Sequence, residues 1–304
     1  MRNLDKYRGV IPAFYACYDD KGEISSERVR ALTEYFVDKK VKGVYVNGSS
    51  GECIYQSVED RKVVLENVMK AKGNLTVINH IACNNTKDGM ELAAHAESLG
   101  VDAIASIPPI YFKLPEYAIA QYWNDYSSAA PNTDFIIYNI PQLAGVSLSR
   151  GLYAKMRENK NVIGVKNSSM PTYDIQGFVR DGGEDYIVFN GPDEQFVSGR
   201  AAGAKAGIGG TYGAMPELFI AMDESINSGD IKRAGEIQYY VNDIIERLTS
   251  GHGNMYAMIK EVLRINEGLD IGSVRKPLVA LNSDDKEIAK AAAKMIVDAK
   301  KKFL

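Results

Sequence analysis

Eight short segments rich in β-forming residues recur along the chain at intervals of about 20 to 34 residues, and this rhythm restricts the fold more than any other feature. Most of them are nearly all apolar, as is typical of parallel strands buried on both faces. Segments with the periodicity of amphipathic helices separate them. The predicted strands are Gly9–Ala16, Gly43–Val46, Thr76–His80, Ala103–Ile107, Phe135–Tyr138, Val162–Lys166, Tyr186–Asn190 and Ala206–Gly209.

The intervening helices carry start and stop signals. Ser57 and Asp60 have the spacing of a capping box, and Gly100 follows a helix predicted over Lys87–Leu99 as its C-cap. A helix predicted over Met215–Asn227 follows the last strand. Eight strand–helix units in succession predict an α/β fold, a closed (β/α)₈ TIM barrel. The alternative is a doubly wound sheet, which usually has fewer strands and a glycine loop for phosphate after the first strand. No GxGxxG pattern follows the first strand here.

After about residue 228 the strand pattern stops and only helical segments remain. Ser283 is placed to cap the last of them. We therefore predict a barrel catalytic domain over residues 1–228 and a helical extension over residues 229–304 that packs on the barrel. The helices predicted for this extension are Asp230–Leu248, Met255–Ile265 and Asp284–Phe303.

Charge and composition exclude several classes of function. The formal net charge is −3, and the only long basic run is Lys300–Lys302 at the end of the chain, which argues against nucleic acid or an anionic membrane as a partner. Three cysteines without a CxxC pattern and three scattered histidines disfavour a disulfide framework and a zinc site. The N-terminus has no apolar signal region, and no stretch of about 18 apolar residues occurs. We expect a cytoplasmic protein that acts on a small molecule and needs no metal.

Active sites of (β/α)₈ barrels lie at the C-terminal ends of the strands. Six of the predicted strands are followed at this end by polar or glycine residues, and their convergence on one barrel mouth predicts the site. The six strand ends are Asn47–Glu52, Pro108–Phe112, Tyr138–Pro141, Lys166–Ser169, Asn190–Glu194 and Gly209–Tyr212.

Lys166 is the strongest candidate for a catalytic group. It follows the apolar run Val162–Val165, so it should project into the barrel mouth. An unperturbed lysine has a pKa of about 10.4, and desolvation lowers that pKa and produces an amine nucleophile. The alternative is a solvated or ion-paired lysine at the barrel rim. Tyr138, one strand earlier, favours catalysis because a phenol can relay protons during iminium formation and carbon–carbon cleavage. A lone tyrosine there would more simply be a core residue hydrogen-bonded at the strand end.

The GSSGE turn after the second predicted strand suits an anion. Its backbone N–H groups and the hydroxyls of Ser49 and Ser50 precede a helix and can bind a carboxylate. Glycine–serine turns without such a function are common, so the position of this turn at a strand end is what favours the binding role.

Five motifs together resemble a known family. GSSGE, PPIYF, YNIPQLAGV, GVKNSS and FNGPDEQFVSG, in this order and spacing, resemble the pyruvate-dependent class I aldolases of the N-acetylneuraminate lyase and dihydrodipicolinate synthase family. The resemblance covers essentially the whole chain, including the three-helix tail, and the ordered set is far more specific than any single motif. It implies Schiff-base chemistry without a dissociable cofactor.

The resemblance also implies residue roles. Lys166, in GVK, corresponds to the Schiff-base lysine, and Tyr138, in YNIP, corresponds to the proton-shuttling tyrosine. Ser49 and Ser50 correspond to the residues that hold the pyruvate carboxylate, and Ser49 would also relay the proton. Tyr111, in PPIYF, corresponds to a tyrosine that enters the site of a neighbouring subunit. This last role implies a homotetramer built as a dimer of dimers.

One position separates the two branches of the family. Leu143 stands where the synthase branch carries an arginine for the carboxylate of its second substrate, whereas the lyase branch has leucine. The lyase branch also has an Asp-Glu pair after the seventh strand, which matches Asp193 and Glu194 beside Gly191. Carboxylates can accept hydrogen bonds from the hydroxyls of an open-chain sugar. Without the family context, a solvated loop turn would explain this pair equally well.

Three further positions concern the sugar. Ser168 stands where lyases usually have threonine, so a hydroxyl is kept. Gly210 stands where many lyases carry a serine that contacts the sugar, which leaves the sugar specificity open. Tyr256, in the tail, lies near the position of an aromatic residue that closes the site in lyases.

The resemblance implies a carbon–carbon lyase that cleaves N-acetylneuraminate to pyruvate and N-acetylmannosamine. An aldolase for another 2-keto-3-deoxy sugar acid is the nearest alternative, because of Gly210. Dihydrodipicolinate synthase is disfavoured by Leu143. A non-catalytic protein that binds a sugar or keto acid is disfavoured by the joint presence of Lys166 and Tyr138, which a binding protein would not need.

Overall fold

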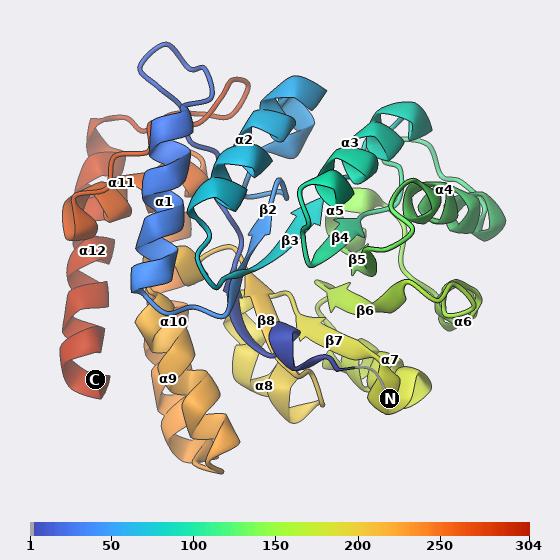
Figure 1. The fold of residues 1–304 in the computed structure, drawn as a ribbon. Helices are drawn as coiled ribbons and strands as arrows, with labels where there is room; N and C mark the ends of the chain where they lie inside the picture. The colour runs from blue at the N-terminus through green and yellow to red at the C-terminus, as the bar shows by residue number, and fades with distance from the viewer. Residues whose placement is uncertain (1–2) are drawn as a thin grey trace.

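The computed structural model describes residues 3–304, in which eight parallel strands form a barrel surrounded by helices (Figure 1). All eight predicted strands are present, so the barrel prediction is confirmed. Residues 1 and 2, the first two of the predicted barrel domain, lie outside the described residues. The strands are β1 Gly9–Pro12, β2 Gly43–Val46, β3 Thr76–His80, β4 Ala103–Ser106, β5 Asp134–Asn139, β6 Val162–Asn167, β7 Ile187–Asn190 and β8 Ala206–Gly209.

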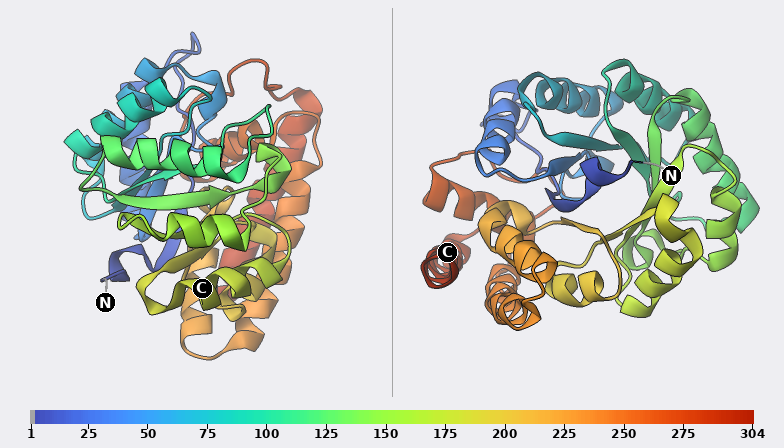
Figure 2. Two further views of the ribbon diagram at one scale, coloured as in Figure 1. Left: turned by 90° about the vertical axis from the view of Figure 1, so that its right-hand side faces the viewer. Right: turned by 60° about the horizontal axis from the view of Figure 1, so that its bottom comes forward.

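The strands are neighbours in the order in which they occur in the chain. Each pairs in parallel with the next from β2 to β8, and β8 pairs with β1. A single parallel bridge between Ala13 and Tyr45 joins β1 to β2, where the Phe14 N–H donates to the Tyr45 carbonyl oxygen at 2.9 Å. The ring of strands is therefore completed at its last junction by a short contact, and the right-hand view of Figure 2 shows the ring within its belt of helices.

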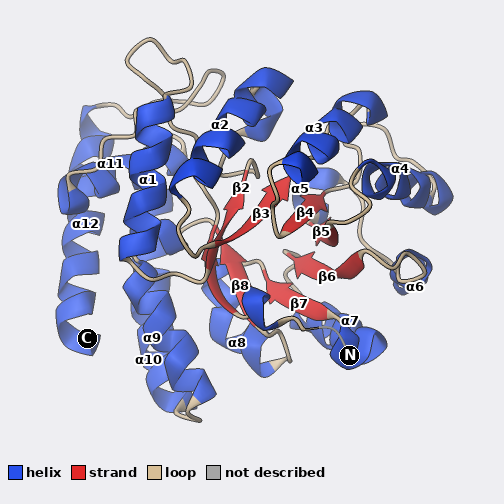
Figure 3. Cartoon of the chain, in the orientation of Figure 1, coloured by secondary structure: helices blue, strands red, loops and turns tan. Residues whose placement is uncertain are grey.

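Helices follow the strands and cover the outside of the barrel (Figure 3). Ser57 and Asp60 form the predicted capping box of α2, and Gly100 after α3 has a φ of 73°, a left-handed conformation that favours glycine. The helices of the barrel are α1 Ser26–Asp38, α2 Val58–Ala71, α3 Thr86–Ser98, α4 Glu116–Ala129, α5 Pro141–Ala144, α6 Arg150–Met156, α7 Thr172–Gly182, α8 Phe196–Ala201 and α9 Pro216–Asn227.

A short 3₁₀ turn near the N-terminus, Asp5–Tyr7, closes the barrel interior at the N-terminal ends of the strands. Tyr7 is fully buried, lies edge-on to Phe189 with ring centroids 6.5 Å apart, and donates its hydroxyl to the Asp102 carbonyl oxygen and the Asp134 carboxylate. Because this plug occupies the N-terminal ends of the strands, the C-terminal ends are left for a site.

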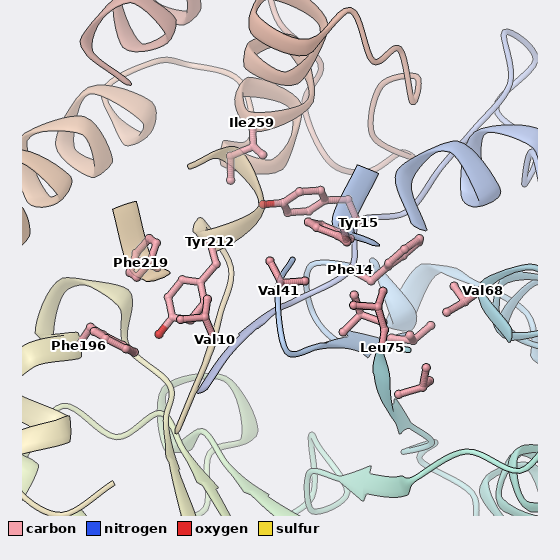
Figure 4. Packing of buried hydrophobic residues seen from close by; sticks show 14 of the residues in the cluster. Val10, Phe14, Tyr15, Val41, Val68, Leu75, Phe196, Tyr212, Phe219 and Ile259 are labelled. Carbon is pink, nitrogen blue, oxygen red and sulfur yellow. The ribbon is translucent and has the colours of Figure 1, made fainter. Parts of the chain in front are cut away.

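A larger apolar core lies between the strands and the surrounding helices. Figure 4 shows part of it, where Phe196, Tyr212 and Phe219 pack together near the segment that follows β1. Tyr15 from that segment and Ile259 from the C-terminal region belong to the same core. The β1 end, the β8 end and the C-terminal region are thereby fixed relative to one another.

Three helices follow the barrel: α10 Ile231–Thr249, α11 Met255–Glu267 and α12 Ser283–Phe303. They lie beside α9 and α1 at the left of Figure 1, and α10 contacts α8, α9 and α12. Their apolar faces join the core of the barrel helices and form no separate core. The division of the chain at residue 228 therefore stays a prediction.

Two local predictions need correction. The first strand ends at Pro12 and does not extend to Ala16. The N–H groups of Ala13 and Phe14 still donate to Gly209 of β8 and Tyr45 of β2, but the chain then leaves the sheet, and the Ala16 N–H donates to the Ser50 carbonyl oxygen in the loop after β2. Ser283 is the first helical residue of α12 and does not cap it. Asn282 is the cap, since its side-chain oxygen accepts from the Asp285 N–H at 2.8 Å and the Asp285 carboxylate accepts from the Asn282 N–H.

Candidate active site

Lys166 and Tyr138 occupy paired positions on neighbouring strands at the C-terminal end of the barrel. Tyr138 of β5 is in register with Lys166 of β6, and the side chains of both are buried. Val165 faces the outer core, so the next residue along the strand faces the barrel interior. The Lys166 Nζ lies 3.8 Å from the centroid of the Tyr138 ring and 4.2 Å from the centroid of the Tyr45 ring. The amine is therefore held between two aromatic faces.

Burial changes the protonation of Lys166. Loss of solvation lowers the pKa of Lys166 to about 7, and the nearby Asp193 carboxylate opposes this change because it favours the charged form. An amine with this pKa is neutral in about half of the molecules at pH 7, whereas an ordinary lysine is almost fully protonated there. The structure thus supplies the neutral amine that nucleophilic attack on a carbonyl carbon requires.

Tyr138 is shifted in the opposite direction. Burial raises the pKa of Tyr138 to about 12, and hydrogen bonds with the Ser168 and Ser49 side chains act against this rise. The phenol stays protonated near neutral pH, and its oxygen is connected to two hydroxyl groups. This arrangement suits a group that passes a proton between a substrate and a hydroxyl relay.

The GSSGE loop between β2 and α2 places two hydroxyls at the barrel mouth. Asn47, just before the loop, and Glu52, its last residue, have left-handed backbone conformations with φ values of 57° and 56°. The Glu52 N–H donates to the Ser49 carbonyl oxygen at 2.9 Å and closes a turn. Ser50 is buried, whereas Ser49 is partly exposed. Gly48 is required because a Cβ at that position would overlap the Tyr45 ring.

Asp193 and Glu194 have different environments. The buried Asp193 accepts two hydrogen bonds of 2.6 Å, from the N–H and the hydroxyl of Thr211. Burial raises the pKa of Asp193 to about 6, and the bonds from Thr211 oppose this rise. Glu194 is exposed on the rim of the cavity. The first carboxylate is therefore fixed, and the second is free to meet solvent or a ligand.

Gly210 leaves space beside the helical tail. A Cβ at this position would lie 3.5 Å from Ser50 Oγ and 3.8 Å from Tyr256 Cε1, which are ordinary contact distances. The Gly210 carbonyl oxygen accepts a 2.7 Å hydrogen bond from the Tyr15 hydroxyl. Tyr256, near the start of α11, lies next to Tyr15 with ring centroids 6.5 Å apart. The backbone of Gly210 is thus fixed by a hydrogen bond, and the space that a side chain at this position would occupy is free.

These groups line one cavity of about 260 Å³ at the C-terminal end of the barrel. Eleven of the twelve predicted site residues line it, including one from the helical tail. They are Ser49, Ser50, Tyr138, Leu143, Lys166, Ser168, Gly191, Asp193, Glu194, Gly210 and Tyr256.

Tyr111 is the exception. Its side chain is 90% exposed, with a positive φ of 84°, and it does not line the Lys166 cavity. The neighbouring Pro108 and Ile110 line a second cavity of about 270 Å³ together with Arg61 and other residues. Of the six predicted strand ends, the one after β4, Pro108–Phe112, therefore does not reach the Lys166 cavity within one chain, because its loop turns outward.

Sequence reasoning missed several groups that shape the cavity. Tyr45 is hidden in the apolar strand GVYV, although its position between two valines identifies the inward-facing residue. Thr211, which holds Asp193, lies in a strand end that was recognised, but its role was not. Gln142 donates to the Ser168 carbonyl oxygen at 2.7 Å, and Met255 lines the cavity from α11. No local pattern in the sequence indicates these last two roles.

A buried amide network supports the ends of β5 and β6 from behind. The Asn139 side-chain amide donates to the Asn167 side-chain oxygen at 2.7 Å, and the Asn167 amide donates to the Ser169 hydroxyl at 3.0 Å. That hydroxyl donates to the Asp174 carboxylate at 2.6 Å. These bonds fix the loops that carry Ser168 and the residues around it.

Within residues 3–304, no three or more histidine, cysteine, aspartate or glutamate side chains are grouped so that they could hold a metal ion. Over the same range, no helix is both long enough and apolar enough to cross a membrane.

Comparison with known proteins supports the motif-based resemblance. A curated N-acetylneuraminate lyase from Mediterraneibacter gnavus is 70% identical over 305 aligned residues, covering 100% of this chain and 97% of the relative. The solved catalytic lysine mutant of the Ruminococcus gnavus sialic acid aldolase is also 70% identical, covers 100% of both chains and has a TM-score of 0.99. A solved Clostridium difficile protein in complex with mannosamine is 28% identical over 98% of this chain and 99% of that one, with a TM-score of 0.90.

The family assignment rests on two independent matches. The model of the dihydrodipicolinate synthetase family matches residues 6–296, which is nearly the whole chain. The curated relative at 70% identity aligns with 100% of this chain and 97% of its own length. The chain therefore belongs to the dihydrodipicolinate synthetase family.

Proposed function

We propose that the protein is a class I aldolase that cleaves N-acetylneuraminate to pyruvate and N-acetylmannosamine. The observation that carries the proposal is the buried amine of Lys166, whose pKa is lowered to about 7 beside the phenol of Tyr138. The 70% identical relatives are named as an N-acetylneuraminate lyase and a sialic acid aldolase, and one of them was solved as a catalytic lysine mutant. These names agree with the chemistry that the cavity suggests.

The first half of the reaction forms an iminium. The neutral Lys166 amine attacks the C2 keto carbon of the open-chain sugar acid, and the resulting carbinolamine loses water. The C2–N double bond that forms carries a positive charge, so it can accept the electron pair released when the C3–C4 bond breaks. Tyr138 lies beside the amine and can supply and remove the protons that the loss of water requires.

The second half breaks the carbon–carbon bond. The Tyr138 oxygen takes the proton of the C4 hydroxyl as its own proton passes to the Ser49 hydroxyl. The C3–C4 electron pair moves into the iminium and gives an enamine, while C4 becomes the aldehyde of N-acetylmannosamine. The proton that entered the relay returns to protonate C3, and addition of water to the resulting iminium then releases pyruvate and regenerates the Lys166 amine. In this account Tyr111 of a neighbouring subunit extends the proton relay.

The other residues of the cavity position the substrate. Ser49 and Ser50 bind the carboxylate next to the keto carbon through their hydroxyls, which the turn closed by the Glu52 N–H carries at the barrel mouth. Asp193 and Glu194 accept hydrogen bonds from sugar hydroxyls at the far end of the cavity.

Four further residues line the cavity around the substrate. Ser168 adds a hydroxyl next to Tyr138, and Gly191, Leu143 and Tyr256 shape the wall of the cavity. Leu143 is 65% exposed and brings no charge, so the cavity wall offers no arginine at that position for a second carboxylate.

We extend the proposal to assembly and location. The exposed Tyr111 on an outward-turning loop fits a role in the site of a neighbouring subunit, so we propose a homotetramer arranged as a dimer of dimers in the cytoplasm. A light-scattering measurement of molar mass tests this, with four times the 33.4 kDa chain mass expected and a stable monomer as the contradicting result.

Borohydride reduction in the presence of pyruvate tests the covalent chemistry. Reduction of the iminium to a secondary amine should add the pyruvate-derived group permanently, and peptide mass spectrometry should place it on Lys166. Absence of labelling, or labelling on another lysine, would contradict the assignment. Lys205, exposed at the opposite end of β8, serves as an internal control that should remain unlabelled.

A further inference from the structure

A buried ion pair joins the GSSGE loop to helix α11 outside the lining of the cavity. Glu52 and Lys260 have 0% and 1% side-chain exposure, and their charged groups are 2.9 Å apart. The second oxygen of Glu52 accepts from the Tyr18 hydroxyl at 3.0 Å and from the Arg275 N–H at 2.8 Å. Lys260 also donates to the Ser273 carbonyl oxygen at 2.6 Å. Both charges are therefore well partnered without any contact with the substrate cavity.

The pair lies directly behind two residues that do line the cavity. Glu52 follows Ser50 by two residues in the loop. Lys260 follows Tyr256 by four residues, so these two side chains lie on the same side of α11. The Ser50 and Tyr256 side chains hydrogen-bond to each other at the barrel mouth. The same two chain segments thus meet twice, once at the cavity and once at the buried ion pair.

The energetics of buried charges indicate what such a pair contributes. Removing two charges from water costs about as much as their attraction returns, so a buried pair adds little stability compared with apolar residues of the same size. Its partners nevertheless fix its geometry closely, because any displacement leaves a buried charge without a partner. Glu52 also holds a left-handed backbone conformation that residues other than glycine rarely adopt. The pair therefore holds the end of the GSSGE turn in one conformation.

We propose that Glu52 and Lys260 are positioning residues that set the distance between the GSSGE hydroxyls and Tyr256, so that the C-terminal helical region completes the carboxylate pocket. This inference rests on the proposed aldolase function, in which Ser49 and Ser50 hold the pyruvate carboxylate. Neither residue touches the reacting atoms, and their effect passes through the backbone of the turn and through α11.

The double variant Glu52→Gln/Lys260→Met tests the proposal, because it removes both charges and leaves neither one unpaired. Borohydride trapping at varied pyruvate concentration yields a half-saturating concentration and a maximal trapping rate. We expect the half-saturating concentration to rise by about tenfold or more, since small misplacement of binding groups has large effects. The maximal rate should stay within about twofold, because Lys166 and Tyr138 are not displaced.

A matched control lies on the same helix. Glu267, at the other end of α11, pairs with Lys39 at 3.0 Å and Lys300 at 3.4 Å, away from the cavity. Glu267→Gln should lower the unfolding temperature and leave the half-saturating pyruvate concentration unchanged. An unchanged half-saturating concentration in the double variant, or an equal rise in the control, would overturn the proposal.

A milder variant covers the case in which the double variant does not fold. Tyr18→Phe removes one donor to Glu52 and keeps the ion pair, so the half-saturating pyruvate concentration should rise by about two- to fivefold. A value equal to that of the wild type would count against the positioning role. If pyruvate does not trap the wild-type protein, the proposed aldolase function fails, and this outcome is distinct from failure of the positioning role.

Discussion

Lys166 Nζ lies 3.8 Å from the centroid of the Tyr138 ring, and the two residues are register partners on β6 and β5. The same burial that lowers the pKa of the amine raises the pKa of the phenol. One burial effect therefore leaves the base form of the lysine and the acid form of the tyrosine populated at the same pH. These two protonation states are the ones that the proposed Schiff-base chemistry requires of its nucleophile and its proton carrier.

The rate of iminium formation should depend on pH with a midpoint near 7. Because the pKa of Lys166 is lowered to about 7, the fraction of neutral amine increases as the pH rises through this value and is small at lower pH. This expectation is checked by the initial rates of borohydride trapping with saturating pyruvate, corrected for loss of reagent at low pH. The pH should be varied from about 5 to about 10, which covers roughly two to three units on each side of the midpoint. A midpoint near the ordinary lysine pKa of about 10.4 would be inconsistent with a desolvated amine.

Asp193→Asn should move this midpoint to lower pH. The Asp193 carboxylate favours the ammonium form and raises the pKa of Lys166, so its removal lets that pKa fall further. The asparagine side-chain oxygen can still accept from Thr211, which limits the structural change. Glu194→Gln is the matched control, because this exposed neighbour should leave the midpoint in place. An upward shift in the Asp193 variant would refute the electrostatic link.

Tyr138→Phe should slow cleavage strongly, and it should slow but not abolish trapping of pyruvate on Lys166, because the phenol serves both steps while water can replace it in iminium formation. Loss of a positioned proton carrier typically costs about 10²- to 10⁴-fold in rate, whereas the aromatic ring that contacts the amine remains. Steady-state cleavage and pyruvate trapping should be measured on the same preparation, with the exposed Tyr117→Phe as control. Full cleavage activity in the Tyr138 variant would remove this residue from the proton path.

Gly210→Ser should be tolerated and should tighten binding of the sugar. The added Cβ would meet Ser50 and Tyr256 only at ordinary contact distances, so the unfolding temperature should not fall. One new hydrogen bond is worth about 0.5–1.5 kcal/mol, which predicts a KM for N-acetylneuraminate lower by roughly two- to tenfold with kcat little changed. A strong loss of stability would show that the added side chain does not fit, and a raised KM would show that the substrate needs the open space at position 210.

The fold was predictable because each strand is an isolated apolar run between amphipathic helices. The segment from Val162 to Lys166 shows why, since four apolar residues and a terminal lysine identify both a buried strand and its functional end. The first strand was predicted too long because Ala16 is as buried as a strand residue while its N–H donates to a loop. Burial predicts an apolar residue, but it does not decide which partner satisfies the backbone.

The candidate site was predictable where a side chain follows a strand within a few residues, as Ser168 does after β6 and Asp193 does after β7. Contacts between segments that are far apart in the sequence were not predictable. The Glu52–Lys260 ion pair joins residues 208 positions apart, and neither residue has a local pattern that indicates the other. Tyr45 and Thr211 were missed for a related reason, because their roles arise from neighbours on other strands. The cavity wall contributed by α10 and α11 likewise depends on how the tail packs on the barrel.

The most direct test of the central claim is release of pyruvate from N-acetylneuraminate, coupled to lactate dehydrogenase and followed as loss of NADH. We expect rapid release with the wild-type protein and with Lys205→Ala, and none above background with Lys166→Ala, which should remain folded because it removes a buried polar group. No release by the wild type, or undiminished release by Lys166→Ala, would contradict the account.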